Sequence, residues 1–268
     1  MKKIWLLVTG VVLSIAIYSC FTNPITGRRA LSLVDEGTMQ QMAQQEYRSF
    51  LSTNPPQRGT RDAEMVSRAG SRIADAVRQY LSSINQLDLI EGYNWEFNLV
   101  NNNSANAWAM PGGKVAVYSG LLPLVQNEAG LATVMGHEVA HAIARHASER
   151  ASQQLAAQYG SQALGGLLGS NPGAASQIFD LAVGIGAQGA LLKFSRDQES
   201  EADRMGLIFM ALAGYNPNEA LNFWSRMSAA KSGSGAPPEI LSTHPSDQTR
   251  MNNIRKWIPE AMKYYRPN

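Results

Sequence analysis

Cysteine, histidine and an excess of either charge are scarce in this chain of 268 residues. The single cysteine excludes an intramolecular disulfide. The net charge of +2 comes entirely from Lys2 and Lys3, and the residues beyond position 19 carry 21 basic and 21 acidic side chains. This balance gives no electrostatic reason to expect nucleic acid or anionic substrates as partners. Only four histidines are present, so a regular spacing among them is informative.

Long apolar runs are also rare, although the composition, with 44% hydrophobic and 16% charged residues, is that of a globular protein. The run Ile4–Ile17 is shorter than the roughly 20 residues that a membrane span needs. It follows a basic start and ends just before Cys20, which predicts an export signal over residues 1–19. The junction is similar to a bacterial lipobox, in which Cys20 becomes the lipidated first residue. An uncleaved anchor is the alternative, because Tyr18 is unusual in a lipobox.

The residue after Cys20 bears on the location of the protein. Phe21 stands where lipoproteins retained at the inner membrane usually carry aspartate. We therefore expect a periplasmic protein attached to the outer membrane through lipid on Cys20. Residues 20–30 are polar and rich in turn formers, and we expect them to form a tether.

The strongest chemical signal is the pattern His-Glu-x-x-His at His137, Glu138 and His141. We predict one helix over 127–150, on which the two histidines lie within about 40° of each other and share a metal ion. Zinc favours imidazole ligands in a four-coordinate shell. Glu138 lies about 100° away and flanks the ion, where it can take a proton from a metal-bound water. With so few histidines, a chance occurrence of this pattern is on the order of a few per thousand.

The rest of the chain predicts a mainly helical α+β fold with a small hairpin or sheet beside the metal-binding helix. Residues 93–100 alternate between apolar and polar, as in a half-buried strand. The strand candidates 107–110 and 114–119 flank Pro111-Gly112-Gly113 and predict a hairpin. A strand edge near a metal site can pair with an extended peptide, which favours a peptidase. The predicted helices are 35–51, 61–81, 195–213, 217–228 and 247–264, and the box Ser195 to Gln198 caps one of them.

Residues 151–192 are rich in alanine, glycine, glutamine and leucine. Two interpretations remain open: a mobile lid over the site, or an ordinary helical hairpin built from small residues. Its apolar part, 181–192, is too short for a membrane span.

A catalytic zinc ion needs three protein ligands, and the helical pattern supplies two. On a continuous helix His146 lies about 140° from His141, so it cannot reach the same ion and is expected to be a structural or surface residue. The predicted helix 195–213 carries Glu199 and Asp203, four residues apart on one face.

The motifs together resemble the gluzincin zinc metallopeptidases related to HtpX and to the CAAX prenyl endopeptidases, in their periplasmic lipoprotein branch. The matching stretches are N-A-W-A-M-P-G-G-K at 106–114, V-M-G-H-E-V-A-H-A at 134–142, F-S-R-D-Q-E-S-E-A-D at 194–203 and S-T-H-P at 242–245. The resemblance implies one zinc ion per chain, with Glu199 as the third ligand; Glu201, which points elsewhere on the helix, is the alternative. It also implies a single metallopeptidase domain over 31–268 without the helical-repeat tail of longer relatives. Asp203 is then expected to accept a hydrogen bond from a ligand histidine and fix its tautomer.

His244 has more than one interpretation. It precedes a proline, so its backbone is not helical. It could donate to the oxyanion formed on the substrate carbonyl, or occupy the fourth zinc position in a resting state and keep the enzyme inactive. The remaining interpretation is a surface histidine that caps a helix. Arg250 could stabilise the same oxyanion or be a surface charge.

These observations predict a zinc-dependent endopeptidase of the bacterial cell envelope that acts on misfolded or misassembled envelope proteins. In the expected mechanism a zinc-activated water attacks the peptide carbonyl, with Glu138 as general base. The alternative function is a chaperone or assembly factor for outer-membrane proteins that uses the same peptide groove with latent proteolysis. Polypeptides and the membrane are the expected partners.

Overall fold

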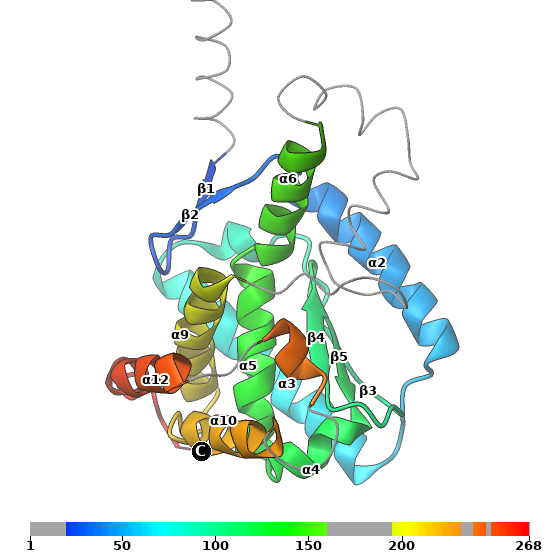
Figure 1. Ribbon diagram of the computed structural model, residues 1–268, viewed down its shortest axis with the longest axis vertical. Helices are drawn as coiled ribbons and strands as arrows, with labels where there is room; N and C mark the ends of the chain where they lie inside the picture. The colour runs from blue at the N-terminus through cyan, green and yellow to red at the C-terminus, as the bar shows by residue number, and fades with distance from the viewer. Residues whose placement is uncertain (1–19, 160–194, 232–237, 245–247, 268) are drawn as a thin grey trace, which may run out of the picture.

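The protein is described from a computed structural model that covers residues 20–159, 195–231, 238–244 and 248–267. The predicted signal 1–19 and most of the predicted lid or hairpin, residues 160–194, lie outside the described residues. A nearly vertical helix, α5, occupies the centre of the view in Figure 1, with a small sheet on one side of it and helices around it. The fold is the predicted mainly helical α+β arrangement.

Short strands and longer helices follow one another along the chain in this order. They are β1 (Cys20–Thr22), β2 (Arg29–Leu31), α2 (Glu36–Thr53), α3 (Arg61–Ser83), β3 (Glu96–Val100), β4 (Ala107–Met110), β5 (Lys114–Tyr118), α4 (Leu122–Val125), α5 (Glu128–Ile143), α6 (His146–Tyr159), α9 (Arg196–Leu212), α10 (Glu219–Lys231), α11 (Ile240–Thr243) and α12 (Gln248–Ala261). Single 3-10 turns at Leu87–Ile90 and Ser119–Leu121 complete the order.

Local sequence signals set several of the helix starts. Thr60 caps α3 by accepting a hydrogen bond from the Ala63 amide, and Ser195 and Gln198 form both bonds of a capping box at the start of α9. The central helix α5 begins at Asn127, whose side chain accepts from the Gly130 amide. Nearly every residue of α5 is buried, so the helix is apolar on most of its circumference and has neighbours on all sides.

The main sheet has three strands in the order β3-β5-β4. The central strand β5 runs parallel to β3 and antiparallel to β4, which confirms the predicted hairpin. Its turn passes through Gly112 and Gly113, both with φ near +80°, where a side chain would be strained. At Gly113 a Cβ would also lie 2.8 Å from the Trp95 ring. The outer strand β4 lies against α5 and therefore borders the histidine-bearing helix.

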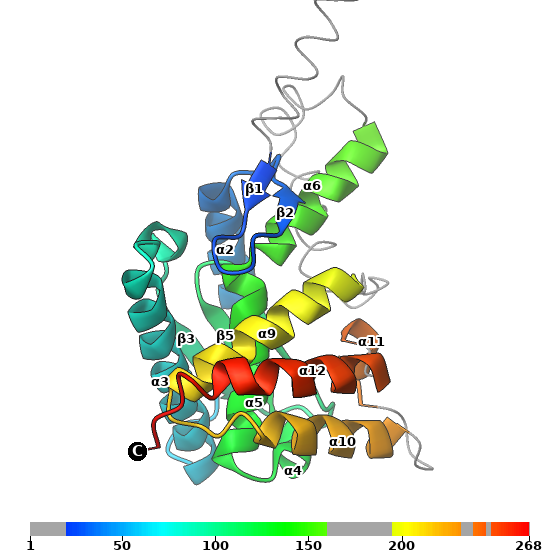
Figure 2. The ribbon, with the colours of Figure 1, turned by 90° about the vertical axis from the view of Figure 1, so that its left-hand side faces the viewer.

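The predicted single helix over 127–150 is wrong, because the chain breaks at Ala144 and Arg145. Arg145 adopts φ +57°, in the left-handed region, and α6 starts afresh at His146. The guanidinium of Arg145 lies 4.8 Å from the centre of the Phe21 ring. The break turns the chain, so that α6 leaves α5 at its upper end in Figures 1 and 2.

The segment predicted as a tether is folded instead. Strands β1 and β2 pair in antiparallel register, Cys20 opposite Leu31, and the hairpin lies beside α6 in both views (Figures 1 and 2). Asn23 and Ala30 of this hairpin are buried, while Cys20 is exposed. The physical reason is a set of long-range polar contacts that a turn-rich sequence does not reveal. Among the described residues, no helix combines the length and the apolarity needed to cross a membrane.

Helices α5 and α9 pack against each other more extensively than any other pair of described elements. Their backbones lie close together at Gly136 and Gly206, where a Cβ on Gly206 would lie 2.9 Å from the Gly136 carbonyl carbon and the His137 nitrogen. Only glycine at both positions allows the backbones to meet at this distance. The crossing therefore places the first turn of α9 beside the histidines of α5.

Candidate metal centre

Four buried side chains that can bind a metal ion converge at the crossing of α5 and α9. His137 and His141 come from α5, Glu199 from the first turn of α9, and His244 follows α11. One nitrogen or oxygen from each lies within 4.8 Å of the others. The structure therefore brings together all three residues predicted as ligands, and adds His244 to them.

Each donor is held by its own element. His137 and His141 lie one turn apart on α5, with ring centres 4.6 Å apart. Glu199 follows directly from the capped start of α9. His244 is fixed through α11, since its amide donates to the Ile240 carbonyl at 2.9 Å, and the Ile240 amide in turn donates to the Ala105 carbonyl at 3.1 Å, just before β4.

Four of the donor separations are close to those of a tetrahedral zinc site. His137 Nε2 lies 3.0 Å from His141 Nε2 and 3.1 Å from His244 Nδ1. Glu199 Oε1 lies 2.8 Å from His244 Nδ1 and 3.3 Å from His141 Nε2. A tetrahedral shell with zinc–ligand distances of about 2.0–2.1 Å has donors about 3.3 Å apart. The cluster offers three imidazoles and one carboxylate, and zinc prefers ligands of these types.

Burial and charge put two of the donors, His141 and Glu199, in the forms that bind a cation. Burial lowers the pKa of His141 well below its usual value, so its ring is neutral and carries a lone pair. Burial raises the pKa of Glu199, but the charges of His244 and Arg250 outweigh it and hold the pKa well below its usual range. Burial lowers the pKa of His244, and the carboxylates of Glu199 and Glu138 more than reverse that shift.

Glu138 lies beside the cluster but outside it. Its side chain is buried, and its Oε1 accepts no hydrogen bond from a described residue and lies 3.5 Å from His244 Nε2. Burial raises the pKa of Glu138, against smaller opposing effects of His244 and His137. A buried carboxylate oxygen with no donor is costly unless a further group contacts it. Glu138 is thus placed to contact a group bound at the cluster.

Asp203 and Arg250 support His137 from behind. Asp203 Oδ1 lies 2.9 Å from His137 Nδ1, the contact that the sequence predicted. Arg250 is buried and bidentate on Asp203, at 2.8 and 2.7 Å, and its Nη1 lies 2.9 Å from Glu199 Oε2. Its guanidinium also lies 3.5 Å from the centre of the Trp224 ring. Arg250 is therefore not a surface charge.

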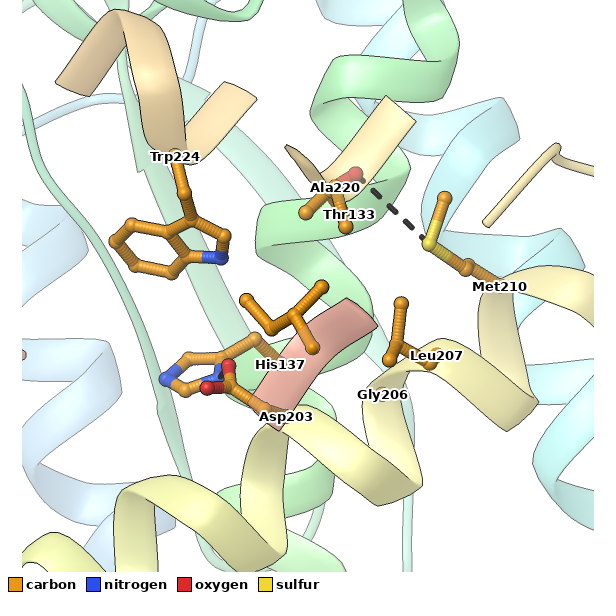
Figure 3. Close-up of a pocket in the computed structure, with 9 residues that line it drawn as sticks. Thr133, His137, Asp203, Gly206, Leu207, Met210, Ala220 and Trp224 are labelled. Atoms are coloured by element: carbon orange, nitrogen blue, oxygen red, sulfur yellow. Dashed lines mark hydrogen bonds and ion pairs between the residues drawn. The ribbon is translucent and has the colours of Figure 1, made fainter. Parts of the chain in front are cut away.

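The outer side of His137 is tightly packed, as Figure 3 shows. Asp203 lies against the ring in this view, and Trp224 stands above it, with ring centres 5.9 Å apart. The cavity in Figure 3 measures only about 10 Å³, roughly the space that one water needs. Its lining is Thr133, His137, Asp203, Gly206, Leu207, Met210, Ala220, Trp224 and Ile254. The ring of His137 consequently has little freedom to turn.

Two residues have contacts that sequence reasoning did not find. His146, expected away from the site, is fully buried, and its Nδ1 lies 2.7 Å from His141 Nδ1. Glu201, the alternative ligand, lies against His146 at 2.9 Å and is not part of the four-donor cluster. The predicted direction of His146 was wrong because it assumed one continuous helix, and α5 ends before His146. Nothing local signals that break, since the residue with positive φ is Arg145 rather than glycine or asparagine.

Comparisons with known proteins agree with this geometry. Residues 70–258 match the model of peptidase family M48. The chain is 32% identical over 238 residues to the mitochondrial metalloendopeptidase OMA1 of Schizosaccharomyces pombe, covering 89% of this chain and 66% of that protein. It is 38% identical to the OMA1 of Saccharomyces cerevisiae over 183 residues, which cover 66% of this chain and 51% of that protein. It is also 32% identical over 164 residues to the beta-barrel assembly-enhancing protease of Yersinia pestis, covering 60% and 34% of the two chains.

The chain thus covers less than two thirds of the length of each of these relatives. The family match nevertheless spans most of the sequence and includes all four donors, the flanking glutamate, Asp203 and Arg250. Peptidases of family M48 depend on zinc, which agrees with the convergence of four possible ligands at this site. The expected resemblance to HtpX-related metallopeptidases is confirmed, and the chain belongs to peptidase family M48.

Proposed function

We propose that the protein is a zinc-dependent endopeptidase that hydrolyses peptide bonds in polypeptide substrates. The observation that carries the proposal is the buried Oε1 atom of Glu138, which accepts no hydrogen bond from a described residue and lies beside four side chains that can bind a metal ion. His137, His141 and Glu199 would hold the ion. When bound, zinc polarises a carbonyl and lowers the pKa of water towards about 7.

The residues of the chain then divide the proton chemistry and the positioning between them. Glu138 accepts the proton of the attacking water and returns it to the leaving amine. Asp203 accepts the Nδ1 hydrogen of His137, which leaves Nε2 free to face the cluster. Arg250 holds Asp203 and one oxygen of Glu199 in place, so the ligand carboxylate and the orienting carboxylate are fixed together.

We assign His244 to the fourth donor position of a resting, inactive state. Its Nδ1 faces both His137 Nε2 and Glu199 Oε1, which supports a ligand-like position more than a donor aimed at a substrate oxyanion. Substrate entry then requires His244 to leave the cluster. Its element is short and is joined to the start of β4 by one backbone hydrogen bond, from Ile240 to Ala105.

The substrate class follows from the strand beside the site. β4 forms an edge of the three-stranded sheet within the described residues and packs on α5. An extended peptide can pair with such an edge through main-chain hydrogen bonds. We propose misfolded or misassembled envelope proteins as substrates, and attachment to the outer membrane through lipid on the exposed Cys20. The name of the Yersinia pestis relative, which refers to β-barrel assembly, supports this location.

The decisive experiment is the substitution Glu138→Gln. Because the amide cannot accept the proton, we expect one zinc ion to remain bound while casein cleavage falls by about 10²–10⁴-fold. Glu64→Gln, on an exposed face of α3, is the matched control and should cleave like the wild type. Full activity of a zinc-loaded Glu138→Gln protein would refute the mechanism.

The same variant separates the endopeptidase from the chaperone or assembly factor. A peptide-binding role needs the groove but not the base. Relief of envelope stress by Glu138→Gln would therefore support the chaperone, and loss of that relief supports proteolysis as the working activity.

A further inference from the structure

A second chain of polar contacts leads away from the zinc ligand His141, and the proposed mechanism does not use it. His141 Nδ1 lies 2.7 Å from His146 Nδ1, and His146 Nε2 lies 2.9 Å from Glu201 Oε2. All three side chains are buried. A buried contact between two imidazoles that ends on a carboxylate is unusual for groups that only fill space.

The ring hydrogens of this chain of contacts can be assigned from its two ends. His141 presents Nε2 to the donor cluster, 3.0 Å from His137 Nε2. With a metal ion held there, both Nε2 atoms would carry their lone pairs towards it, and the ring hydrogen of His141 would lie on Nδ1. His146 must then accept at Nδ1, and its own hydrogen lies on Nε2, where it donates to Glu201. Each ring nitrogen in the series is thus either a donor or an acceptor. The negative charge of Glu201 polarises the imidazole of His146, and through it the hydrogen bond from His141.

The far end of the series is held by the amino-terminal hairpin. Glu201 Oε1 accepts from Asn23 Nδ2 at 2.8 Å, and Thr26 and Arg28 also contact the Glu201 carboxylate. Arg28 forms two further bonds to Glu149 on α6, at 2.9 and 2.7 Å. The guanidinium therefore joins the hairpin to both α6, which carries His146, and α9, which carries Glu201.

The two histidines of α5 are thus oriented in parallel ways from one helix. Asp203 of α9 contacts His137 directly, whereas Glu201 of α9 reaches His141 through His146. Partners of this kind fix the tautomer and raise the basicity of a metal-bound imidazole, and their loss typically costs about 10–100-fold in metal affinity.

We propose that His146 is a positioning residue for the zinc ligand His141, and that Arg28 of the hairpin completes its support through Glu201. This inference rests on the proposed zinc function. It gives the folded segment after Cys20 a defined role, because that segment then fixes one metal ligand of a site that lies more than 100 residues further along the chain.

The test compares zinc affinity with folding stability in the full chain. His146→Phe keeps the ring volume and removes both hydrogen bonds, whereas His146→Asn restores an acceptor at the Nδ1 position. Arg28→Met removes the far support, and Arg204→Met is its matched control, because Arg204 on α9 forms a close ion pair with Glu260 outside the series. Zinc affinity is measured by competition with a fluorescent chelator, and thermal unfolding of the zinc-free proteins reports stability.

We expect His146→Phe to bind zinc about 10–100-fold more weakly than the wild type in its folded fraction. His146→Asn should recover much of that loss, Arg28→Met should show a smaller loss, and Arg204→Met none. A folded His146→Phe protein with wild-type zinc affinity overturns the inference.

If His146→Phe does not fold, the zinc affinities of His146→Asn and His146→Gln are compared instead, and this comparison tests the inference. Gln carries its amide towards Glu201 and not towards His141, so equal zinc affinities of the two variants overturn the inference, and tighter binding by His146→Asn supports it. Failure of the wild type itself to bind zinc would instead refute the proposed function, which the same titration reveals.

Discussion

The glycine pair at the crossing of α5 and α9 makes a quantitative prediction. A Cβ on Gly206 would lie 2.9 Å from two backbone atoms of the facing helix, the Gly136 carbonyl carbon and the His137 nitrogen, while ordinary contact begins at 3.4 Å. Backbone cannot rotate away as a side chain can, so the helices must separate by about 0.5 Å. Such overpacking costs about 1–3 kcal/mol, and the better helix propensity of alanine returns about 0.5–1 kcal/mol.

The middle of the first range less that of the second gives a destabilisation of the zinc-free Gly206→Ala protein by about 1 kcal/mol, which corresponds to about 2–4 °C in unfolding temperature. The substitution should also weaken zinc binding, because Glu199 and Asp203 belong to α9 and His137 belongs to α5, so separating the helices moves these residues apart. Thermal unfolding and chelator competition measure the two effects. Gly37→Ala is the matched control, since its methyl group meets only the Asp35 side chain, at 3.1 Å, on the exposed start of α2. Wild-type stability and zinc affinity in Gly206→Ala would refute the close crossing.

Three further predictions concern the metal centre itself. His244→Ala should still bind one zinc ion and cleave casein faster than the wild type; a zinc-loaded but inactive variant would assign His244 to the transition state instead. Arg250→Met leaves Asp203 and one oxygen of Glu199 without their buried cation, so it should lower the free energy of unfolding by about 3–5 kcal/mol in chemical denaturation. Removal of zinc with EDTA should lower the unfolding temperature, because an ion at 100 times its Kd adds about 2.7 kcal/mol to the folded state, and an unchanged temperature would argue against tight binding.

Local signals were sufficient for much of the fold and for the centre of the site. The spacing of His137 and His141 depends only on helix geometry, and the caps at Thr60 and Ser195 depend on residues three positions away. These features survive folding because tertiary contacts do not have to create them. The ligand role of Glu199 came from resemblance, since spacing alone left Glu201 open.

The features that the sequence did not reveal all depend on distant partners. Arg145 adopts a positive φ, which is uncommon for arginine, and folding the amino-terminal hairpin requires contacts between residues 121 and 178 positions apart. The burial of Arg250 similarly requires Asp203, 47 positions away, and the ring of Trp224. A window of neighbouring residues contains no trace of such contacts.

Three of the four acidic residues of α9 give the helix an unusual thermodynamic role. Glu199, Glu201 and Asp203 occupy little more than one turn, and each contacts at least one buried histidine. When this helix opens locally, a ligand and both orienting carboxylates leave together, and only the histidine donors remain at the cluster. An ion that binds only the closed form must therefore slow amide hydrogen exchange along the whole of α9, and not only at its ligand. The exchange rate of this one helix thus reports the occupancy of the metal centre.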